Sequence, residues 1–320
     1  MLGLSEQDIE RAVSYNELVD AMEEALKTYA GGNFLMPDRM HVHAGENTLL
    51  LMPCFAGSSF STKIVSVFPD NAQHQMPVIQ GLMILNDGQT GTPLALLNGS
   101  KLTGMRTAAV GSVGVRYLSP ENTESLGIIG AGIQGFYQAV CACTQRPIKS
   151  LTVYSRRKEP TMRFIEQLET HLPSIRIEPA DSSEDLLERS QLVICATSSR
   201  DPVLPDDIEL LRGKTIIGVG SFKPDMMEFS RALYDSVETI FVDTEFASRE
   251  SGDLAIPLEK GWITEQRIQP LAKLITGEGS ASCGETGCFK SVGMALFDLF
   301  AARLIYRRAL EKELGNRIDL

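Results

Sequence analysis

The chain has 320 residues, of which 43% are hydrophobic and 22% charged, values typical of a globular protein large enough for two domains. Its formal net charge is -11. Nucleic acids and anionic membranes attract proteins through a surplus of lysine and arginine, so this balance argues against both as main partners. In such an acidic chain, a local group of cations is a stronger indication of a specific anion site than it would be in a basic protein.

The compartment follows from the N-terminus and the cysteines. Residues 1–6 lack the basic and apolar segments of a secretion signal. The six cysteines contain no CxxC pair, so we expect reduced thiols, a cytoplasmic protein and no metal site. Residues 125–145 carry no charge, and a membrane span needs about 20 mainly apolar residues. That stretch opens with β-branched residues and contains glycine and glutamine, so we predict no span there.

The first hundred residues predict two helices followed by a run of strands. Ser5 precedes Asp8, and Ser14 precedes Glu17, both at the spacing of a capping box at a helix N-terminus. Strand-like segments then follow one another without helices between them, which predicts an antiparallel or mixed sheet. These segments are residues 36–42, 48–52, 60–68, 78–85 and 93–97.

The pattern changes at residue 119, where short apolar runs begin to alternate with helical stretches. Such runs are typical of strands buried on both faces of a parallel sheet. We therefore predict an α/β chain in which residues 119–291 form a Rossmann-type, doubly wound parallel sheet. Residues 1–118 and 292–320 form a strand-rich α+β substrate domain, because the amphipathic C-terminal helix pattern needs an apolar partner. The predicted parallel strands are 126–129, 151–154, 192–196, 215–219 and 239–242.

A dinucleotide-binding fingerprint joins the first parallel strand to a helix. In such a loop the first glycine (Gly130) permits a tight turn, the second (Gly132) lets the backbone approach a pyrophosphate, and the third (Gly135) packs helix against strand. The N-terminus of the helix offers unpaired amides to the phosphates. The predicted cofactor residues of this loop are Gly130, Ala131, Gly132, Ile133, Gln134 and Gly135.

The residues after the second parallel strand select the cofactor. NAD enzymes usually place Asp or Glu there for the ribose hydroxyls, but this chain has Ser155, Arg156 and Arg157. A hydroxyl and guanidinium groups bind a 2′-phosphate, which favours NADPH, with NADH possible and a solvated basic loop as the alternative. Loops after later strands also face the cofactor in this fold, which adds Ala196, Thr197, Ser198, Val219, Gly220 and Ser221.

Three cations lie in apolar surroundings of the first domain, namely Arg39, Lys63 and Arg106. Each alone is equally compatible with an exposed or ion-paired residue. Together they indicate a pocket for a small carboxylate, because the guanidinium fork matches carboxylate geometry.

Several segments resemble the ornithine cyclodeaminase / mu-crystallin family. They are residues 63–69, 102–109, the fingerprint and 289–293, in family order over nearly the whole chain. The resemblance implies a homodimer built through the strand-rich domain and an active site between the two domains. It assigns the substrate carboxylate to Arg39, Lys63, Arg106 and the adjoining Thr107, and it assigns Lys290 and Ser291 to the cofactor side.

One difference from the cyclodeaminases of this family limits which reaction we expect. Cyclodeaminases of this family carry an Asp where this chain has Phe222, and phenylalanine can neither accept a proton nor orient a water. The segment 220–225 resembles instead the members that reduce cyclic ketimines. We therefore predict reduction of 1-pyrroline-2-carboxylate or 1-piperideine-2-carboxylate to proline or pipecolate, with Lys63 and Arg106 as the catalytic residues. Asp225 is interpreted as a turn residue.

The alternatives are ornithine cyclodeamination, oxidation of an amino acid such as alanine, and a mu-crystallin-like protein that binds NADPH without turnover. Glu245, Glu250 and Asp253 are equally compatible with the border of the active site and with a solvated loop.

Overall fold

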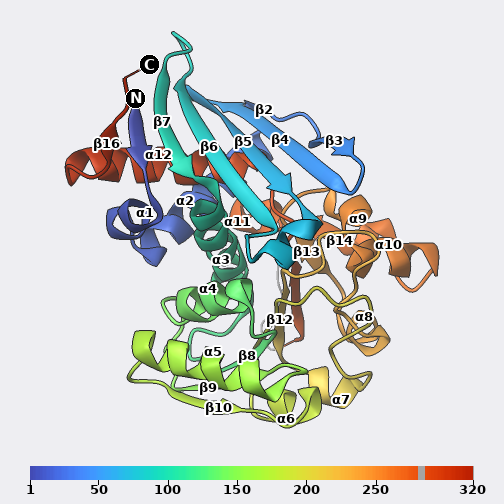
Figure 1. Ribbon diagram of the computed structural model, residues 1–320. Coiled ribbons are helices and arrows are strands. Elements are labelled where there is room, and N and C mark those ends of the chain that lie inside the picture. Colours follow the sequence, from blue (N-terminus) through green and yellow to red (C-terminus); the bar gives the residue numbers. More distant parts are fainter. Residues whose placement is uncertain (280–284, 320) are drawn as a thin grey trace. The chain divides into compact units, whose positions relative to one another are not determined.

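The structure is a computed structural model that describes residues 1–279 and 285–319, and it divides into two compact units (Figure 1). Unit 1 comprises Met1–Arg106 and Met294–Leu320, and unit 2 comprises Thr107–Gly293. The first division lies inside helix α3 (Gly99–Leu118). The sequence-based boundary after residue 118 assigns that whole helix to the first domain and stays a prediction.

Unit 1 is built on a mixed sheet, sheet A, with the order β16-β1-β7-β6-β5-β4-β2 and β3 paired with β4. All its pairs are antiparallel except β1 with β7, which confirms the predicted mixed sheet. Strands β1 and β16 come from opposite ends of the chain, and neither they nor β2 were predicted. The predicted strand 36–42 was wrong over residues 36–39, because β3 begins at Met40. The strands are β1 (Leu2–Leu4), β2 (Phe34–Leu35), β3 (Met40–Ala44), β4 (Asn47–Ala56), β5 (Ser59–Val67), β6 (Ile79–Asp87), β7 (Pro93–Asn98) and β16 (Asn316–Arg317).

Helices cover one face of sheet A. Helices α1 (Glu6–Ala12) and α2 (Tyr15–Gly31) begin at the two predicted capping boxes, in which the Ser side chain accepts a backbone N–H and the acidic side chain accepts the N-cap N–H. Helix α12 (Ala295–Glu311) packs on β4, β5, β6 and α2. A short 3-10 helix, η1 (Pro69–His74), follows β5. The predicted C-terminal helix therefore joins the first unit.

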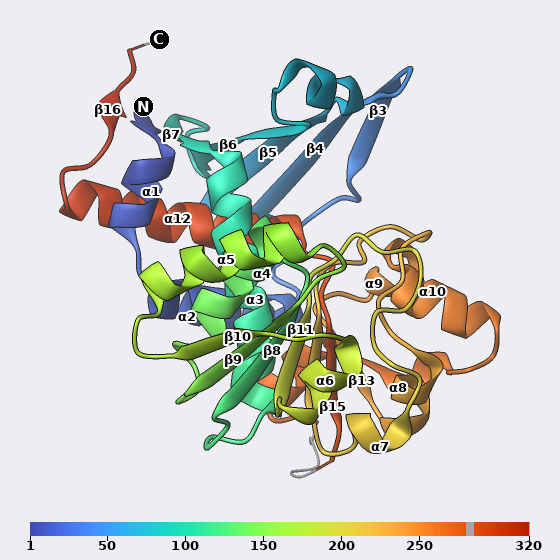
Figure 2. The same cartoon turned by 60° about the horizontal axis from the view of Figure 1, so that its bottom comes forward.

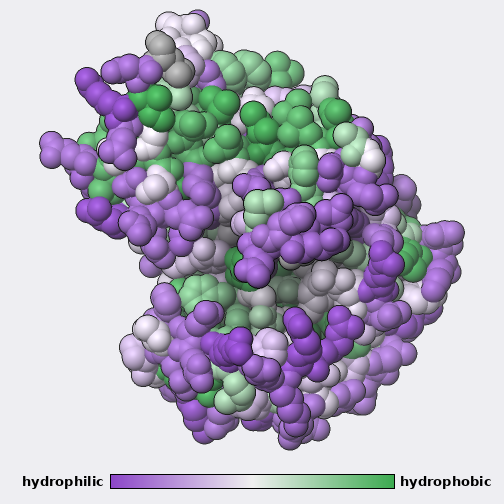
Figure 3. Space-filling model, viewed as in Figure 1, coloured by the Kyte–Doolittle hydropathy of each residue, from purple (hydrophilic) through white to green (hydrophobic). Residues whose placement is uncertain are grey.

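The opposite face of sheet A exposes apolar side chains (Figure 3). Within β4 the residues on one side, such as Met52 and Cys54, are buried, whereas Leu49 and Phe55 on the other side are exposed. The Phe55 and Phe60 rings stack at a centroid distance of 4.5 Å on neighbouring strands. The large exposed apolar residues of strands β2 to β6 on this face are Leu35, Met40, Val42, Leu49, Phe55 and Leu82.

Unit 2 contains a parallel sheet, sheet B, with the order β10-β9-β8-β11-β12-β15-β13-β14. Every pair in it is parallel, which confirms the predicted Rossmann-type sheet. The five predicted strands are present, and β10, β14 and β15 were missed. The strands are β8 (Ser125–Ile129), β9 (Ser150–Tyr154), β10 (Arg176–Pro179), β11 (Leu192–Cys195), β12 (Thr215–Gly218), β13 (Ile240–Val242), β14 (Ile268–Pro270) and β15 (Gly287–Lys290).

Helices α4 and α5 lie side by side against β8, β9 and β10 (Figures 1 and 2). The remaining helices follow the later strands. The helices of unit 2 beyond α3 are α4 (Ile133–Ala142), α5 (Lys158–His171), α6 (Ser183–Glu188), α7 (Ile208–Leu211), α8 (Arg231–Ser236), α9 (Ala247–Glu250), α10 (Gly252–Glu259), η2 (Glu265–Arg267) and α11 (Leu271–Ile275).

The uncharged stretch 125–145 divides into strand β8 and the ten-residue helix α4. Among the described residues, no helix is long and apolar enough to cross a membrane. The cysteines Cys54, Cys141, Cys143, Cys195 and Cys288 are free thiols, whereas Cys283 lies outside the described residues. The cytoplasmic location stays a prediction.

Candidate functional site

The fingerprint loop is a close-packed turn between β8 and α4. Gly130 has a φ of 115°, and a Cβ at this position would lie 2.6 Å from the carbonyl oxygen of Ala196. A Cβ on Gly135 would lie 2.1 Å from the carbonyl oxygen of Gly130. Gly132, the N-cap of α4, has no atom within 4 Å of an added Cβ. The first and third glycines are thus required by packing, while the second leaves the amides at the helix N-terminus open to a phosphate.

The basic segment after β9 lies at the start of α5. Ser155 is half-buried, and Arg156 and Arg157 are exposed. Within residues 1–279 and 285–319, neither guanidinium forms an ion pair with a carboxylate. Two cations without an internal anion suit an external phosphate.

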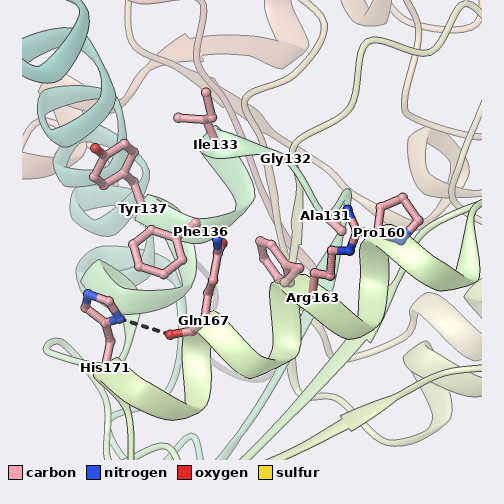
Figure 4. A pocket seen from close by; sticks show the side chains of 10 residues that line it. Ala131, Gly132, Ile133, Phe136, Tyr137, Pro160, Arg163, Gln167 and His171 are labelled. Atoms are coloured by element: carbon pink, nitrogen blue, oxygen red, sulfur yellow. Dashed lines mark hydrogen bonds between the residues drawn. The ribbon is translucent and has the colours of Figure 1, made fainter.

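A groove of about 580 Å³ begins at the fingerprint and runs between α4 and α5 (Figure 4). Phe136 meets His171 edge to face at 4.9 Å, and the Nδ1 atom of His171 lies 2.9 Å from the carbonyl oxygen of Gln167. The lining of the groove shares Ala131, Gly132 and Ile133 with the fingerprint but includes none of residues 155–157. The groove therefore extends from the fingerprint loop along the two helices.

Glu228 holds the two later loops of the predicted cofactor site. Its carboxylate accepts the backbone N–H of Thr197 at 2.6 Å, of Gly220 at 2.8 Å and of Ser221 at 3.1 Å. The Thr197 hydroxyl donates to it as well, at 2.9 Å. Because one buried side chain bonds both loops, residues 196–198 and 219–221 are fixed relative to each other. Of these, Ser198 is exposed, Ala196 is half-buried and Val219 is buried.

Lys290 lies in the same buried network, which we call the acidic cluster (Glu228, Asp253 and Lys290). All three side chains are completely buried. The Nζ atom of Lys290 lies 2.8 Å from Oδ2 of Asp253 and 3.8 Å from Oε2 of Glu228. Asp253 Oδ1 accepts the backbone N–H groups of Glu228 and Phe229. Burial alone would lower the pKa of Lys290, but the charges of Asp253 and Glu228 raise it.

Ser291 takes part in a second buried contact. Its hydroxyl donates to Oδ2 of Asp243 at 2.7 Å, and the backbone N–H groups of Val292 and Gly293 donate to the same oxygen. Asp243 therefore fixes the turn that leads out of β15. The roles of Lys290 and Ser291 as cofactor residues stay predictions.

In unit 1, two of the predicted substrate residues meet at one carboxylate. Lys63 on β5 and Arg106 on α3 are buried, and Asp298 on α12 is completely buried. Lys63 Nζ lies 2.7 Å from Oδ2 of Asp298, and Arg106 Nε donates to its Oδ1 at 2.8 Å. We call these residues the cationic cluster (Lys63, Arg106 and Asp298), since two cations share one anion.

The protonation of the cationic cluster follows from burial and charge. Burial lowers the pKa of Lys63 to about 8, with Arg106 and Arg39 acting in the same direction and Asp298 opposing them. Burial would raise the pKa of Asp298, but Arg106 and Lys63 hold it below its usual value. Arg39 is half-buried in the segment between β2 and β3, and its positive charge helps to lower the pKa of Lys63. Thr107 adjoins Arg106 on α3.

Asp298 and Glu228 were not predicted as site residues, and the predicted setting of Asp253 was wrong. Asp298 is the only charged residue in the apolar stretch 291–302, and a lone acid in such a stretch needs a buried partner. Glu228 lies between Met227 and Phe229, which is a similar signal. Asp253 belongs neither to a solvated loop nor to an open border, because its carboxylate is enclosed with Lys290.

Phe222 and Asp225 lie in the exposed turn after β12. The Phe222 side chain is 42% exposed. Asp225 is exposed and pairs with Arg200 at 3.1 Å, as expected for a turn residue on the surface.

Comparison with known proteins defines the family. The family model for the ornithine cyclodeaminase/mu-crystallin family matches residues 2–313. A Delta(1)-pyrroline-2-carboxylate reductase of Bacillus cereus is 32% identical over 332 residues, covering 100% of both chains. The structure of Thermococcus litoralis Delta(1)-pyrroline-2-carboxylate reductase in complex with NADH and L-proline has a TM-score of 0.92 at 32% identity, covering 99% of this chain and 100% of that one.

An archaeal alanine dehydrogenase dimer with bound NAD has a TM-score of 0.90 at 28% identity, with 100% of this chain and 99% of that chain covered. These matches extend over the whole of both units, as the order of the sequence motifs predicted. The chain belongs to the ornithine cyclodeaminase/mu-crystallin family.

Proposed function

We propose that this chain reduces a small cyclic imine carboxylate, 1-pyrroline-2-carboxylate or 1-piperideine-2-carboxylate, to proline or pipecolate with a reduced nicotinamide cofactor. The observation that carries the proposal is the cationic cluster, in which two buried cations share one carboxylate and so retain a net positive charge. A substrate carboxylate supplies the missing anion. Full-length similarity to Delta(1)-pyrroline-2-carboxylate reductases supports the same reaction.

The fingerprint loop fits a dinucleotide. At Gly130 and Gly135 there is no room for a side chain, so the tight turn requires glycine. The space around Gly132 is open, which leaves backbone amides available for a pyrophosphate. The loops fixed by Glu228 add residues 196–198 and 219–221 to the same binding site. When bound, the reduced nicotinamide supplies a hydride.

The predicted substrate residues have two roles, which are binding of the carboxylate and transfer of a proton. Arg106 and Arg39 bind the carboxylate, and the pKa of Lys63, about 8, lets it hold or release a proton near neutral pH. Reduction adds hydride at C2 of the protonated imine, and the π-electron pair of the C=N bond moves to nitrogen. The product is a secondary amine that takes up a proton, and Lys63 would relay that proton.

We propose that NADPH is preferred to NADH because Arg156 and Arg157 have no carboxylate partner within the described part of the chain. Replacement of both by alanine should weaken NADPH binding roughly 10- to 100-fold, the effect of losing charged hydrogen bonds. NADH binding should change little. Fluorescence titration with each cofactor measures both constants, and an equal loss for the two cofactors would contradict the preference.

The reaction is tested by following cofactor oxidation with the five- and six-membered imines. Assays for ammonia release from ornithine and for alanine oxidation run beside it. Rapid imine-dependent oxidation supports the proposal. The similarity to an alanine dehydrogenase makes alanine oxidation the second candidate, and activity with alanine alone would replace the proposal with it.

We propose a homodimer in which the apolar face of sheet A covers its counterpart in a second copy. The exposed residues on β2 to β6 form a larger apolar surface than single scattered residues do, and such surfaces mark interfaces. The similar alanine dehydrogenase is a dimer. Sedimentation of Leu82→Asp beside wild type tests this, since an unchanged mass would exclude the face.

A further inference from the structure

The C-terminal helix contributes one charged group to the cationic cluster. Helix α12 supplies Asp298, although Lys63 lies on β5 and Arg106 on α3, 192 residues away from Asp298 in the chain. We propose that Asp298 is a positioning residue for the reductase: its two oxygens fix the Lys63 ammonium and the Arg106 guanidinium at the places where they meet the imine carboxylate. The inference rests on the proposed function for the identity of the ligand.

The contacts explain how one carboxylate can position two cations and still leave them able to bind. Asp298 contacts Arg106 through Nε, so the pair of terminal Nη atoms is not used in this ion pair. Those atoms form the other edge of the guanidinium plane, which binds a carboxylate in a bidentate manner. Lys63 is bound by a single oxygen, and an ammonium group has three donors. Each cation therefore retains hydrogen-bonding capacity.

Stability does not by itself explain such a cluster. Buried ion pairs are often no more stabilising than apolar residues of the same volume, because desolvation offsets the Coulomb attraction. Within the described residues, Asp298 accepts no backbone N–H, so it does not fix a loop as Glu228 does. In the same part of the chain, its hydrogen bonds and ion pairs are confined to Lys63 and Arg106.

The charge of Asp298 also acts on Lys63. Burial, Arg106 and Arg39 lower the pKa of Lys63, and Asp298 opposes all three. Without that negative charge, Lys63 would release its proton at a lower pH. Asp298 thus keeps Lys63 protonated over a wider range while it orients the side chain.

Two substitutions separate position from charge. Asp298→Asn keeps the shape of the side chain and removes the charge, whereas Asp298→Glu keeps the charge and moves it by one methylene. Glu311→Gln is the control, because Glu311 is an exposed residue near the end of the same helix. For each folded variant we would measure kcat and KM against pH, thermal stability, and the titration of the Lys63 13Cε signal, assigned with Lys63→Arg.

Asp298→Asn should lower kcat/KM roughly 10- to 100-fold, the effect of losing charged hydrogen bonds. The alkaline limb of its pH profile and the Lys63 titration should both move to lower pH. Asp298→Glu should lower kcat/KM with the alkaline limb nearly unmoved, and Glu311→Gln should match wild type. If the Asn variant does not fold, an unchanged kcat/KM in the Glu variant still overturns the proposal.

A loss of thermal stability with unchanged kcat/KM and an unmoved Lys63 titration would show that Asp298 is only structural. The proposed reaction is tested separately, because the Lys63 titration requires no substrate. Wild type that reduces no cyclic imine would refute the function, while a shifted Lys63 titration in Asp298→Asn would still support the positioning role.

Discussion

The two units each bury a cluster of three charged residues, and the clusters are opposite in sign. The cationic cluster of unit 1 has two cations and one carboxylate, whereas the acidic cluster of unit 2 has two carboxylates and one cation. In the acidic cluster, five backbone N–H groups also donate to the carboxylates. The extra negative charge of the acidic cluster is therefore stabilised by backbone N–H groups of the same unit.

The surplus of the cationic cluster has no such partner within the described residues. Asp298 is shared by Lys63 and Arg106, and a positive charge is left over. A buried charge that the protein does not neutralise is expensive unless a ligand neutralises it. A cluster saturated by backbone donors therefore fixes loops, while a cluster with an unmatched charge is suited to an anionic substrate.

Removal of the cation from the acidic cluster should have the largest effect on folding. Lys290→Met leaves Glu228 and Asp253 buried beside each other, and loss of one partner of a buried ion pair costs about 3–5 kcal/mol. Denaturant unfolding measures the loss, and Lys273→Met, an exposed lysine on α11, is the control. A variant as stable as wild type would remove the structural role that we give this cluster.

Removal of a cation from the cationic cluster should act mainly on catalysis. Arg106→Ala should lower kcat/KM about 30- to 4,000-fold, since truncating one side of a buried charged contact costs about 2–5 kcal/mol. Lys63 remains to pair with Asp298, so the loss of stability should be smaller than in Lys290→Met. Steady-state kinetics with a cyclic imine carboxylate measures the effect, with Arg11→Ala on α1 as the exposed control.

Unchanged kinetics in Arg106→Ala would refute carboxylate binding by this cluster. If Arg106→Ala lost more stability than Lys290→Met, the roles of the two clusters would be exchanged, because the cationic cluster would then be the structural one.

Much of the fold could be predicted from local sequence patterns. Capping boxes at Ser5 and Ser14 mark helix starts, and the apolar runs of unit 2 mark buried parallel strands. The missed strands are short or lack a distinct pattern. Strand β15, for example, includes Lys290, whose burial depends on carboxylates from Glu228 and Asp253. That compensation is a property of the folded chain and is invisible in a local window.

The candidate site shows the same division. The fingerprint and the cations Lys63 and Arg106 could be identified because their residue types carry a specific chemistry. Asp298 was missed because its role appears only when α12 packs on sheet A and brings it to residues distant in the chain. Hydrophobic patterning predicted the packing of that helix but assigned no function to its single buried acid.

The smallest predicted effect on activity and stability is that of breaking an exposed ion pair, which serves as a reference for the two buried clusters. Asp225 pairs with Arg200 at 3.1 Å, but both side chains are more than half exposed. Solvent and salt screen such pairs, which contribute about 0–1 kcal/mol. Asp225→Asn should therefore leave kcat/KM within about twofold of wild type and alter the unfolding free energy by less than about 1 kcal/mol. A large loss of imine reduction with normal stability would instead make Asp225 a functional acid, and the turn after β12 would then belong to the active site.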